Sequence, residues 1–145
     1  MGFSLRINMV DVICDDSLKN SYIDGKKSGC QFMIRLSYYR GHFLSVIDQF
    51  EIRIDGQRVD DQDIRFCINE KELAVNQLAS AYTEFWNILD PACIKIRKPG
   101  GLKPGAHDID VTLMFRSPYM PLPGGDNDHL YMPIDGCGQK TLSIA

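Results

Sequence analysis

The sequence lacks an excess of basic residues, a long apolar run and an export signal. Lys and Arg number 16 against 19 Asp and Glu. The cations are scattered and do not form the stripe typical of a nucleic-acid or anionic-membrane binder. No apolar stretch approaches the ~20 residues of a membrane span, and residues 1–8 mix polar with apolar side chains, unlike a signal peptide. We therefore expect a cytoplasmic protein that binds neither nucleic acid nor membrane.

Recognisable metal and nucleophile motifs are also missing. The three histidines, His42, His107 and His129, form no H-x-H or H-x-x-x-H pair, and there is no C-x-x-C or G-x-S-x-G. The Gly-rich residues 100–105 lack the Lys-Ser/Thr pair and the helix of a P-loop. We predict no catalytic residue and no metal ligand in this chain. His107 is in phase with an apolar face, which favours a hydrogen-bonded structural histidine.

Cysteine is present five times, at Cys14, Cys30, Cys67, Cys93 and Cys137. The number is odd, and no two of these residues are close in sequence. Cytosolic thiols are kept reduced, so we expect free, buried thiols. A disulfide framework is the alternative.

Apolar and polar residues alternate with a period of two along much of the chain, which is typical of half-buried strands in an antiparallel sheet. The turn sequence Asp55-Gly56 indicates a type I′ hairpin. One short segment, at about 76–86, has apolar residues at helical spacing. We predict a single all-β domain over residues 1–145, an antiparallel two-sheet β-sandwich with one short helix. Its strands are expected over residues 32–37, 50–55, 66–68, 92–97, 107–115 and 140–144.

A Pro/Gly-rich segment follows the longest predicted strand. Residues 118–138 combine prolines and glycines with Tyr and Met side chains. Proline has no N–H to donate, so these residues are not expected to continue a central strand. A long segment of this composition either packs over its own sandwich or contacts another chain. We expect an extended segment that contacts a partner.

Two clusters have the composition of an interface. Tyr, Arg and Met are enriched in interface cores and hot spots. We predict a partner interface in which the two clusters lie near each other; packing within the chain is the alternative that the sequence leaves open. One cluster contains Tyr38, Tyr39 and Arg40, and the other contains Tyr119 and Met120. The predicted interface residues are these five together with Tyr131.

Several strings resemble the β subunit of bacterial C-glycoside deglycosidases. They are residues 29–45 (GCQFMIRLSYYRGHFLS), 51–56 (EIRIDG) and 98–107 (KPGGLKPGAH). Residues 116–121 and the KTLSI string near the end are also similar to that family. The match spans most of the chain in order, and the YYRG and PGGL-x-PG-x-H strings are its most specific parts.

The resemblance implies an accessory subunit of a heteromeric lyase complex. In that family the α subunit is a metal-dependent barrel resembling sugar isomerases, and it carries the catalytic residues. The complex cleaves the carbon–carbon bond between sugar and aglycone of a 3-keto C-glycoside by β-elimination. A divalent metal, Mn or Mg, is expected in the α subunit, and no cofactor in this chain.

Two other functions are possible from the residues alone. A free-standing carbohydrate-binding module would need an exposed aromatic platform, for instance Tyr38, Tyr39 and Tyr119 together. A small enzyme would need a site that the known motifs do not reveal.

Overall fold

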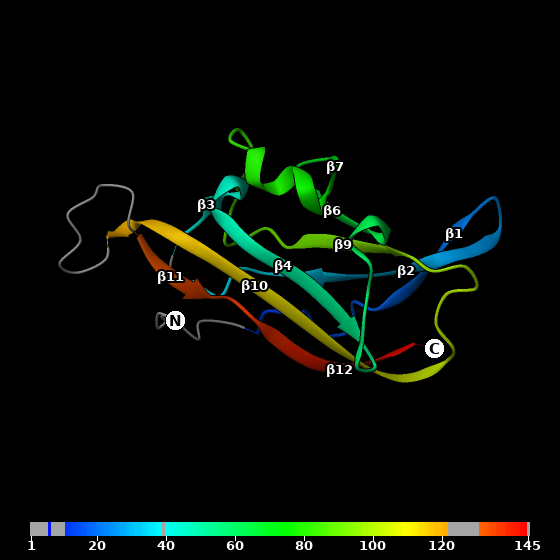
Figure 1. The fold of residues 1–145 in the computed structure, drawn as a ribbon. Coiled ribbons are helices and arrows are strands. Elements are labelled where there is room, and N and C mark those ends of the chain that lie inside the picture. Colours follow the sequence, from blue (N-terminus) through cyan, green and yellow to red (C-terminus); the bar gives the residue numbers. More distant parts are fainter. Residues whose placement is uncertain (1–5, 7–10, 39, 122–130, 145) are drawn as a thin grey trace.

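The computed structural model describes residues 6, 11–38, 40–121 and 131–144, except for the side chains of 117–121 and 131–132. Strands dominate these residues and form two layers (Figure 1). One sheet has five antiparallel strands in the order β1-β2-β9-β6-β7. They are β1 (Lys19–Ile23), β2 (Lys26–Ile34), β9 (Ala92–Arg97), β6 (Ile64–Ile68) and β7 (Lys71–Ala74).

The second sheet is built around one long strand, β10 (Gly105–Pro121). Its first half pairs with β12 (Gly138–Ile144) and its second half with β11 (Tyr131–Asp135). On its other side lies β4 (Ile47–Ile54), followed by β5 (Gln57–Arg58). A separate two-stranded sheet is formed by β3 (His42–Phe43) and β8 (Phe85–Trp86), and its buried residues pack against both larger sheets. The predicted antiparallel two-sheet sandwich is confirmed.

The core is formed by the inner faces of the two sheets, as the period of two predicted. Ile109 and Leu113 of β10 are fully buried, and so are Phe32 and Ile34 of β2. Each large apolar side chain that leaves water in this way stabilises the fold by about 1.5–3 kcal/mol. Aromatic rings pack at the centre of the core, where Phe66 makes edge-to-face contacts with two other rings. Its centroid lies 5.5 Å from that of Phe50 and 5.2 Å from that of Trp86.

Positive-φ residues close three two-residue hairpins. Asp55 and Gly56 have φ of 51° and 81°, and Ile54 pairs directly with Gln57, so the predicted type I′ turn is confirmed. Residues 24–25 and 69–70 also have positive φ and join β1 to β2 and β6 to β7. The last of these turns contains Asn69-Glu70, which has no glycine to reveal it in the sequence.

The helix predicted over residues 76–86 is a shorter 3₁₀ helix, η3 (Val75–Ser80). The apolar residues that follow it belong to β8, where Trp86 is buried and Phe85 is partly exposed. Phe85 and Trp86 point to opposite sides of the strand, as neighbouring strand residues do. Their apolar side chains also fit a helical spacing, which is why the sequence predicts a helix here. Two further one-turn 3₁₀ helices, η1 (Leu44–Val46) and η2 (Asp61–Asp63), precede β4 and β6.

The expectation that the strand ends near Phe115 is wrong, because β10 continues to Pro121 and residues 131–135 form β11. Along β10, pairing with β4 stops at Phe115, which lies opposite Ile47, the first residue of β4. Beyond this point β11 is the only strand paired with β10 in the described residues, and their register shifts between Ser117 and Pro121. Prolines are tolerated at such an edge and in such an irregularity, because few ladder hydrogen bonds are lost there.

None of the helices in the described residues is long and apolar enough to cross a membrane.

Candidate functional site

The structure places Tyr38 in the core, with 1% of its surface exposed. Its ring meets Phe115 edge to face, with centroids 5.7 Å apart and an interplanar angle of 89°. The His42 ring lies 5.1 Å from both of these rings and completes a buried aromatic cluster. Tyr38 therefore cannot present its ring to a partner in this structure, and the platform required by a carbohydrate-binding module loses one of its three members.

The buried position of His42 holds it in the neutral form. Burial lowers the pKa of the ring to about 4, and the Arg40 carbonyl oxygen lies 3.1 Å from Nδ1. A histidine that is 3% exposed has no surface at which to exchange protons with a substrate. His42 is therefore a structural member of the aromatic cluster, whose role is to fix the path of the chain from Tyr38 to Phe43.

Of the other predicted interface residues, the structure describes the side chain of Arg40 alone. Arg40 is exposed. Tyr39 and the side chains of Tyr119, Met120 and Tyr131 lie outside the described residues. The backbone still links the two clusters, because the contact between Tyr38 and Phe115 brings the segment after β2 against the second half of β10.

An exposed aromatic pair, which is not among the predicted interface residues, lies against Gly41, the residue after Arg40. Phe43 of β3 and Phe85 of β8 are opposite each other in register, and their rings meet edge to face with centroids 5.0 Å apart. They are 44% and 38% exposed. Tyr82 and Leu89, on either side of β8 in sequence, are 71% and 82% exposed. We call the exposed side chains of this region, Phe43, Tyr82, Phe85 and Leu89, the aromatic end patch; Phe43 and Phe85 are in direct contact, and Tyr82 and Leu89 flank Phe85 in sequence.

Hydrogen bonds and an ion pair hold the strands that carry the aromatic pair in place. The Leu44 N–H donates to the Glu84 carbonyl at 2.9 Å, and the Asn69 side chain donates to the Phe85 carbonyl at 3.2 Å. Lys71 holds the Glu84 carboxylate at 2.6 Å, and this hydrogen bond lowers the pKa of Glu84, so the pair stays charged at neutral pH. The aromatic end patch is thus presented on an ordered support.

Gly41 allows β3 to lie close to β8. A Cβ atom at this position would fall 2.5 Å from the Trp86 carbonyl oxygen and 2.6 Å from the Phe85 ring. A larger residue would therefore push the two short strands apart. The glycine of the Tyr-Tyr-Arg-Gly string has a packing role, and the string positions both the buried cluster and the exposed pair.

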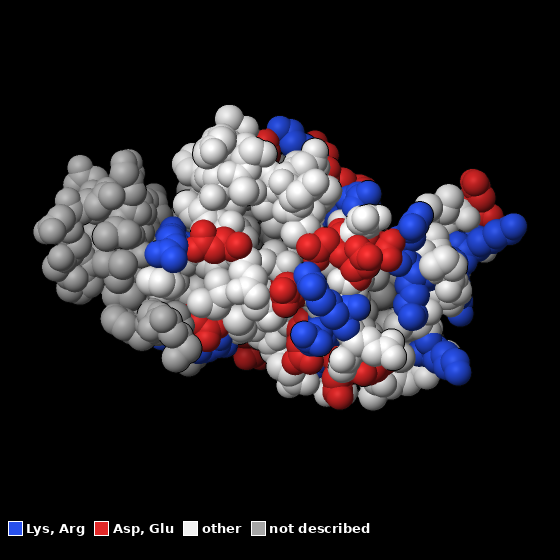
Figure 2. All heavy atoms as spheres, in the orientation of Figure 1, with Lys and Arg blue, Asp and Glu red and all other residues white. Residues whose placement is uncertain are grey.

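Charge is unevenly distributed over the face that carries these elements. Figure 2 shows acidic and basic side chains gathered over the C-terminal end of β4 and the neighbouring end of the molecule, whereas the surface over β3 and η3 is mostly uncharged. An uncharged surface with exposed aromatic rings is characteristic of the core of a protein–protein interface.

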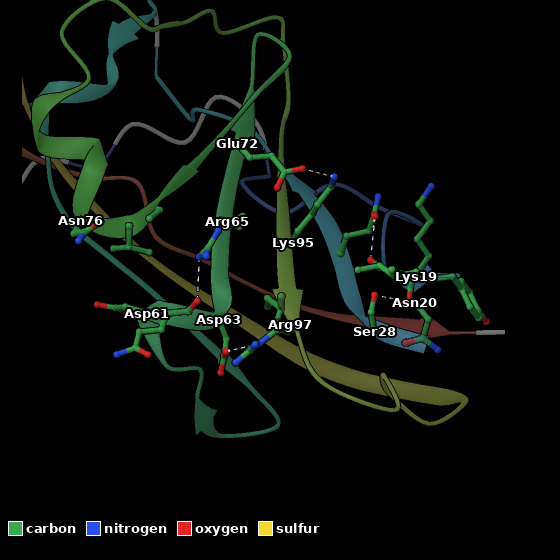
Figure 3. Close-up of a pocket in the computed structure, with 18 residues that line it drawn as sticks. Lys19, Asn20, Ser28, Asp61, Asp63, Arg65, Glu72, Asn76, Lys95 and Arg97 are labelled. Carbon is green, nitrogen blue, oxygen red and sulfur yellow. Dashed lines mark hydrogen bonds and ion pairs between the residues drawn. The ribbon is translucent and has the colours of Figure 1, made fainter. Parts of the chain in front are cut away.

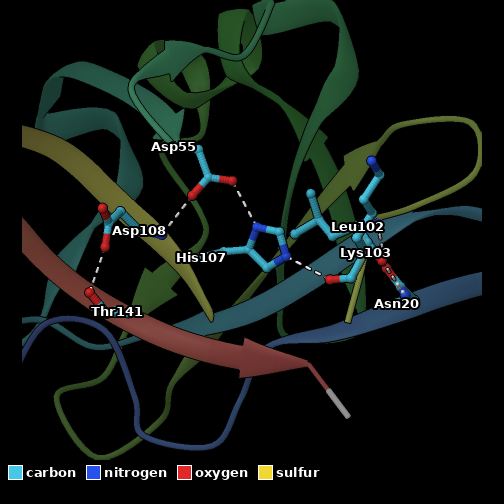
Figure 4. A network of polar contacts seen from close by, with 7 residues as sticks. All are labelled: Asn20, Asp55, Leu102, Lys103, His107, Asp108 and Thr141. Carbon is cyan, nitrogen blue, oxygen red and sulfur yellow. Dashed lines mark hydrogen bonds and ion pairs between the residues drawn. The ribbon is translucent and has the colours of Figure 1, made fainter. Parts of the chain in front are cut away.

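His107 has the structural role that the sequence predicted. Its Nδ1 lies 2.7 Å from an Asp55 carboxylate oxygen, and its Nε2 lies 2.7 Å from the Lys103 carbonyl oxygen (Figure 4). The second Asp55 oxygen accepts the Asp108 N–H at 2.9 Å. The hydrogen bond to Asp55 raises the pKa of His107, and the same contact lowers the pKa of Asp55. This network joins the β4–β5 turn to the start of β10.

In the described part of the chain, no three His, Cys, Asp or Glu side chains are arranged to hold a metal ion. His129 lies outside that part. All five cysteines are free, with Cys30 buried and the others partly exposed. The expectation of buried thiols therefore holds fully for Cys30 alone.

The fold and this surface define a β-sandwich protein with an exposed aromatic end. Residues 9–119 match the family described as C-glycoside deglycosidase beta subunit. The chain is 36% identical over 105 residues to the C-glycoside deglycosidase beta subunit of Eubacterium cellulosolvens, covering 72% of this chain and 70% of the relative. The chain therefore belongs to the C-glycoside deglycosidase beta subunit family, and the resemblance is confirmed.

Two further relatives carry related names. The 3'-dehydrocarminate deglycosidase beta subunit of a Microbacterium species is 34% identical over 114 residues, which cover 78% of this chain and 81% of the relative. A C-glycoside deglycosidase beta subunit of Arthrobacter globiformis is 22% identical over 134 residues, covering 92% and 98%. The term "beta subunit" implies a complex with another subunit.

Proposed function

We propose that this chain is the non-catalytic β subunit of a cytoplasmic, heteromeric C-glycoside deglycosidase, and that catalysis resides in its α subunit. Membership of the β subunit family is the observation that carries the proposal. The substrate would be a 3-keto C-glycoside, in keeping with the dehydro sugar in the name of one relative.

The proposed reaction is a β-elimination. The keto group acidifies the neighbouring C–H, and a base removes that proton. The electron pair then forms a carbon–carbon double bond in the sugar as the bond to the aryl carbon breaks, and an acid gives the aryl carbon a proton. Such a reaction needs a positioned base. His42 is poorly suited to this role, because it is 3% exposed and its pKa of about 4 makes it a weak base. We assign the base, and the divalent Mn or Mg, to the α subunit.

The surface that we assign to the α subunit is the aromatic end patch together with Arg40. Aromatic and Arg side chains dominate the binding energy of interfaces. Tyr39, Tyr119, Met120 and Tyr131 stay in the proposal, because the contact between Tyr38 and Phe115 brings their two segments together. Tyr38 contributes by supporting this surface from the core.

Reconstitution from purified subunits tests the division of labour. The chain alone, the α subunit alone and the mixture are each assayed for aglycone release from a 3-keto C-glycoside, with and without a chelator. We expect turnover only when the α subunit is present, strongest in the mixture, and lost with the chelator. Turnover by this chain alone would place the active site here and overturn the proposal.

A further inference from the structure

The outer face of the β1-β2-β9-β6-β7 sheet is hollowed into a groove of about 1090 Å³ (Figure 3). Residues 19–23 of the β1–β2 hairpin line one side. Residues 61–63 of η2 and 74–76, where β7 meets η3, line the other. Arg40 and the aromatic end patch do not line this groove, so it is separate from the proposed docking surface.

A row of paired residues crosses the groove from edge to edge. Directly paired residues of an antiparallel sheet carry their side chains on the same face. The pairs Lys19–Gln31, Gln31–Lys95, Lys95–Arg65 and Arg65–Ala74 are each in direct register, so one row runs across all five strands. Three cations and one amide of this row line the groove.

The acidic side chains of the groove are already neutralised by ion pairs. Each of its three carboxylates has a basic partner at 3.0–3.4 Å. The pairs are Asp61–Arg58, Asp63–Arg97 and Glu72–Lys95.

Two cations of the row lack such a partner. Arg65 donates from Nη1 to the carbonyl oxygens of Gln62 and Ile64, at 3.0 and 2.9 Å, and makes no ion pair with a carboxylate in the described residues. Lys19 likewise has no ion pair among the residues that the structure describes. Four cations and three carboxylates line the groove, so its lining carries one excess positive charge, in a chain whose net charge is −3. Arg58, the partner of Asp61, lies outside the groove and also contacts Glu51.

The remaining lining is suited to hydroxyl groups. Ser21, Ser28, Gln31 and Asn76 contribute polar side chains to the lining. The Ser21 hydroxyl donates to Gln31 Oε1 at 3.1 Å and the Ser28 hydroxyl donates to the Ser21 carbonyl at 3.3 Å, so the two hydroxyl oxygens remain as acceptors and the Gln31 amide N–H groups as donors. Tyr22, 59% exposed, lies at the hairpin side, where an aromatic ring can stack on a sugar or an aryl group. Small-molecule sites typically enclose about 300–1,000 Å³ and use a few such polar groups to orient the ligand.

We propose that this groove binds a small polyhydroxylated carboxylate, the class that includes acidic glycosides. Its carboxylate lies beside Arg65 and Lys95, which are directly paired on neighbouring strands. Lys19, three strands away from Arg65 on β1, adds to the positive potential of the groove that attracts the carboxylate. Its hydroxyl groups bond to the Ser, Gln and Asn side chains, and Tyr22 covers one face. The site does not depend on the docking of an α subunit and is present in the chain alone.

Two ligands that differ in a single group test the proposal. The purified full-length chain is titrated with para-nitrophenyl β-D-glucuronide and, separately, with the corresponding β-D-glucoside, which has a hydroxymethyl group in place of the carboxylate. Binding is measured by calorimetry, and the site is mapped from backbone amide shifts. We expect the glucuronide to bind with Kd on the order of 1 mM, to shift amides of Lys19, Gln31, Arg65 and Lys95, and to weaken as ionic strength rises.

Charge-removing variants locate the carboxylate. Lys19→Gln and Arg65→Gln should each weaken glucuronide binding by about two- to fivefold, and leave the weaker glucoside binding unchanged. Arg53→Gln is the matched control, an exposed Arg on β4 outside the groove, and should have no effect. Equal affinity for both ligands, shifts outside the groove, or no binding at about 10 mM ligand would each overturn the proposal. Since no α subunit is present, these results are independent of the proposed function.

Discussion

Phe43 and Phe85 face each other across the β3–β8 pair, edge to face, and both rings remain partly exposed. Contiguous apolar surface of this kind is characteristic of sites where another molecule binds. Their neighbours in register, His42 and Trp86, are buried. One face of this pair of short strands therefore packs into the core, and the opposite face is exposed to the proposed partner.

Replacing either ring with Ala should weaken association with the α subunit. Phe43→Ala and Phe85→Ala should each cost about 2 kcal/mol of binding free energy, because interface aromatics of this kind are hot spots. The stability of the isolated chain should fall by only about 1 kcal/mol, through loss of the ring contact. Affinity is measured by calorimetry and stability by urea unfolding.

Tyr22→Ala serves as the control for this experiment. Tyr22 is an exposed aromatic residue in the β1–β2 hairpin, outside the aromatic end patch. Its removal should leave the affinity for the α subunit unchanged. Unchanged affinity in folded Phe43→Ala and Phe85→Ala variants would move the docking surface elsewhere on the sandwich.

Tyr38→Ala should act on folding. Its side chain is 1% exposed and contacts Phe115 and His42. Truncation of a buried aromatic residue costs about 3–5 kcal/mol of unfolding free energy. Tyr38→Phe keeps the ring and should cost much less. Urea unfolding of both variants checks this, and a Tyr38→Ala protein as stable as wild type would mean that the ring is dispensable to the core.

The alternation of apolar and polar residues predicted the sandwich because most of its strands expose one face to solvent. Ile109 and Leu113 could be assigned to the core from spacing alone, and the turn at Asp55-Gly56 could be assigned because Gly favours positive φ. These features depend on local patterns, which the sequence carries directly.

The interface residues are harder to predict, since Tyr38 and Phe43 are both aromatic and close in sequence, yet Tyr38 is buried and Phe43 is exposed. A tyrosine next to an arginine suggests a contact surface, and only the packing of β10 under Tyr38 shows that its ring is buried. The spacing of apolar residues predicts a helical face for Phe85, because the pairing of β8 with β3 joins residues 42 and 44 positions apart and leaves no local signal. The groove could not be predicted from the sequence either, because its row of side chains depends on the register of five strands.

The thiols should react slowly in the folded chain. Burial raises the pKa of Cys30 and of Cys67 to about 11, so little thiolate is present at neutral pH. We expect all five cysteines to titrate as free thiols in urea without reductant, and Cys30 to be the slowest in the native state. A dithiobis-nitrobenzoate assay gives the rates. Mass spectrometry that finds a defined disulfide in the purified protein would contradict this prediction and the cytoplasmic assignment.

The contact between His107 and Asp55 predicts a stability that depends on pH. The pKa of His107 is raised above its ordinary value of 6.5, so the contact stabilises the fold fully below pH 6.5 and loses this contribution as pH rises through the folded pKa. The pKa of Asp55 is lowered below 3.8, so its contribution is present above pH 3.8 and is lost as pH falls through the lower folded value. The contact should therefore be strongest between pH 3.8 and 6.5.

Asp55→Asn isolates this contribution, since the amide keeps the shape of the side chain but not its charge. The difference in unfolding free energy between wild type and Asp55→Asn should be largest near pH 5 and should shrink as pH rises above the folded pKa of His107. The NMR titration of the His107 ring should give a pKa above 6.5 in the wild type and a lower one in Asp55→Asn. Thr141→Val, a substitution beside the network that leaves both partners in place, should not change the His107 titration. A difference that does not vary with pH would show that His107 and Asp55 are joined by a neutral hydrogen bond alone.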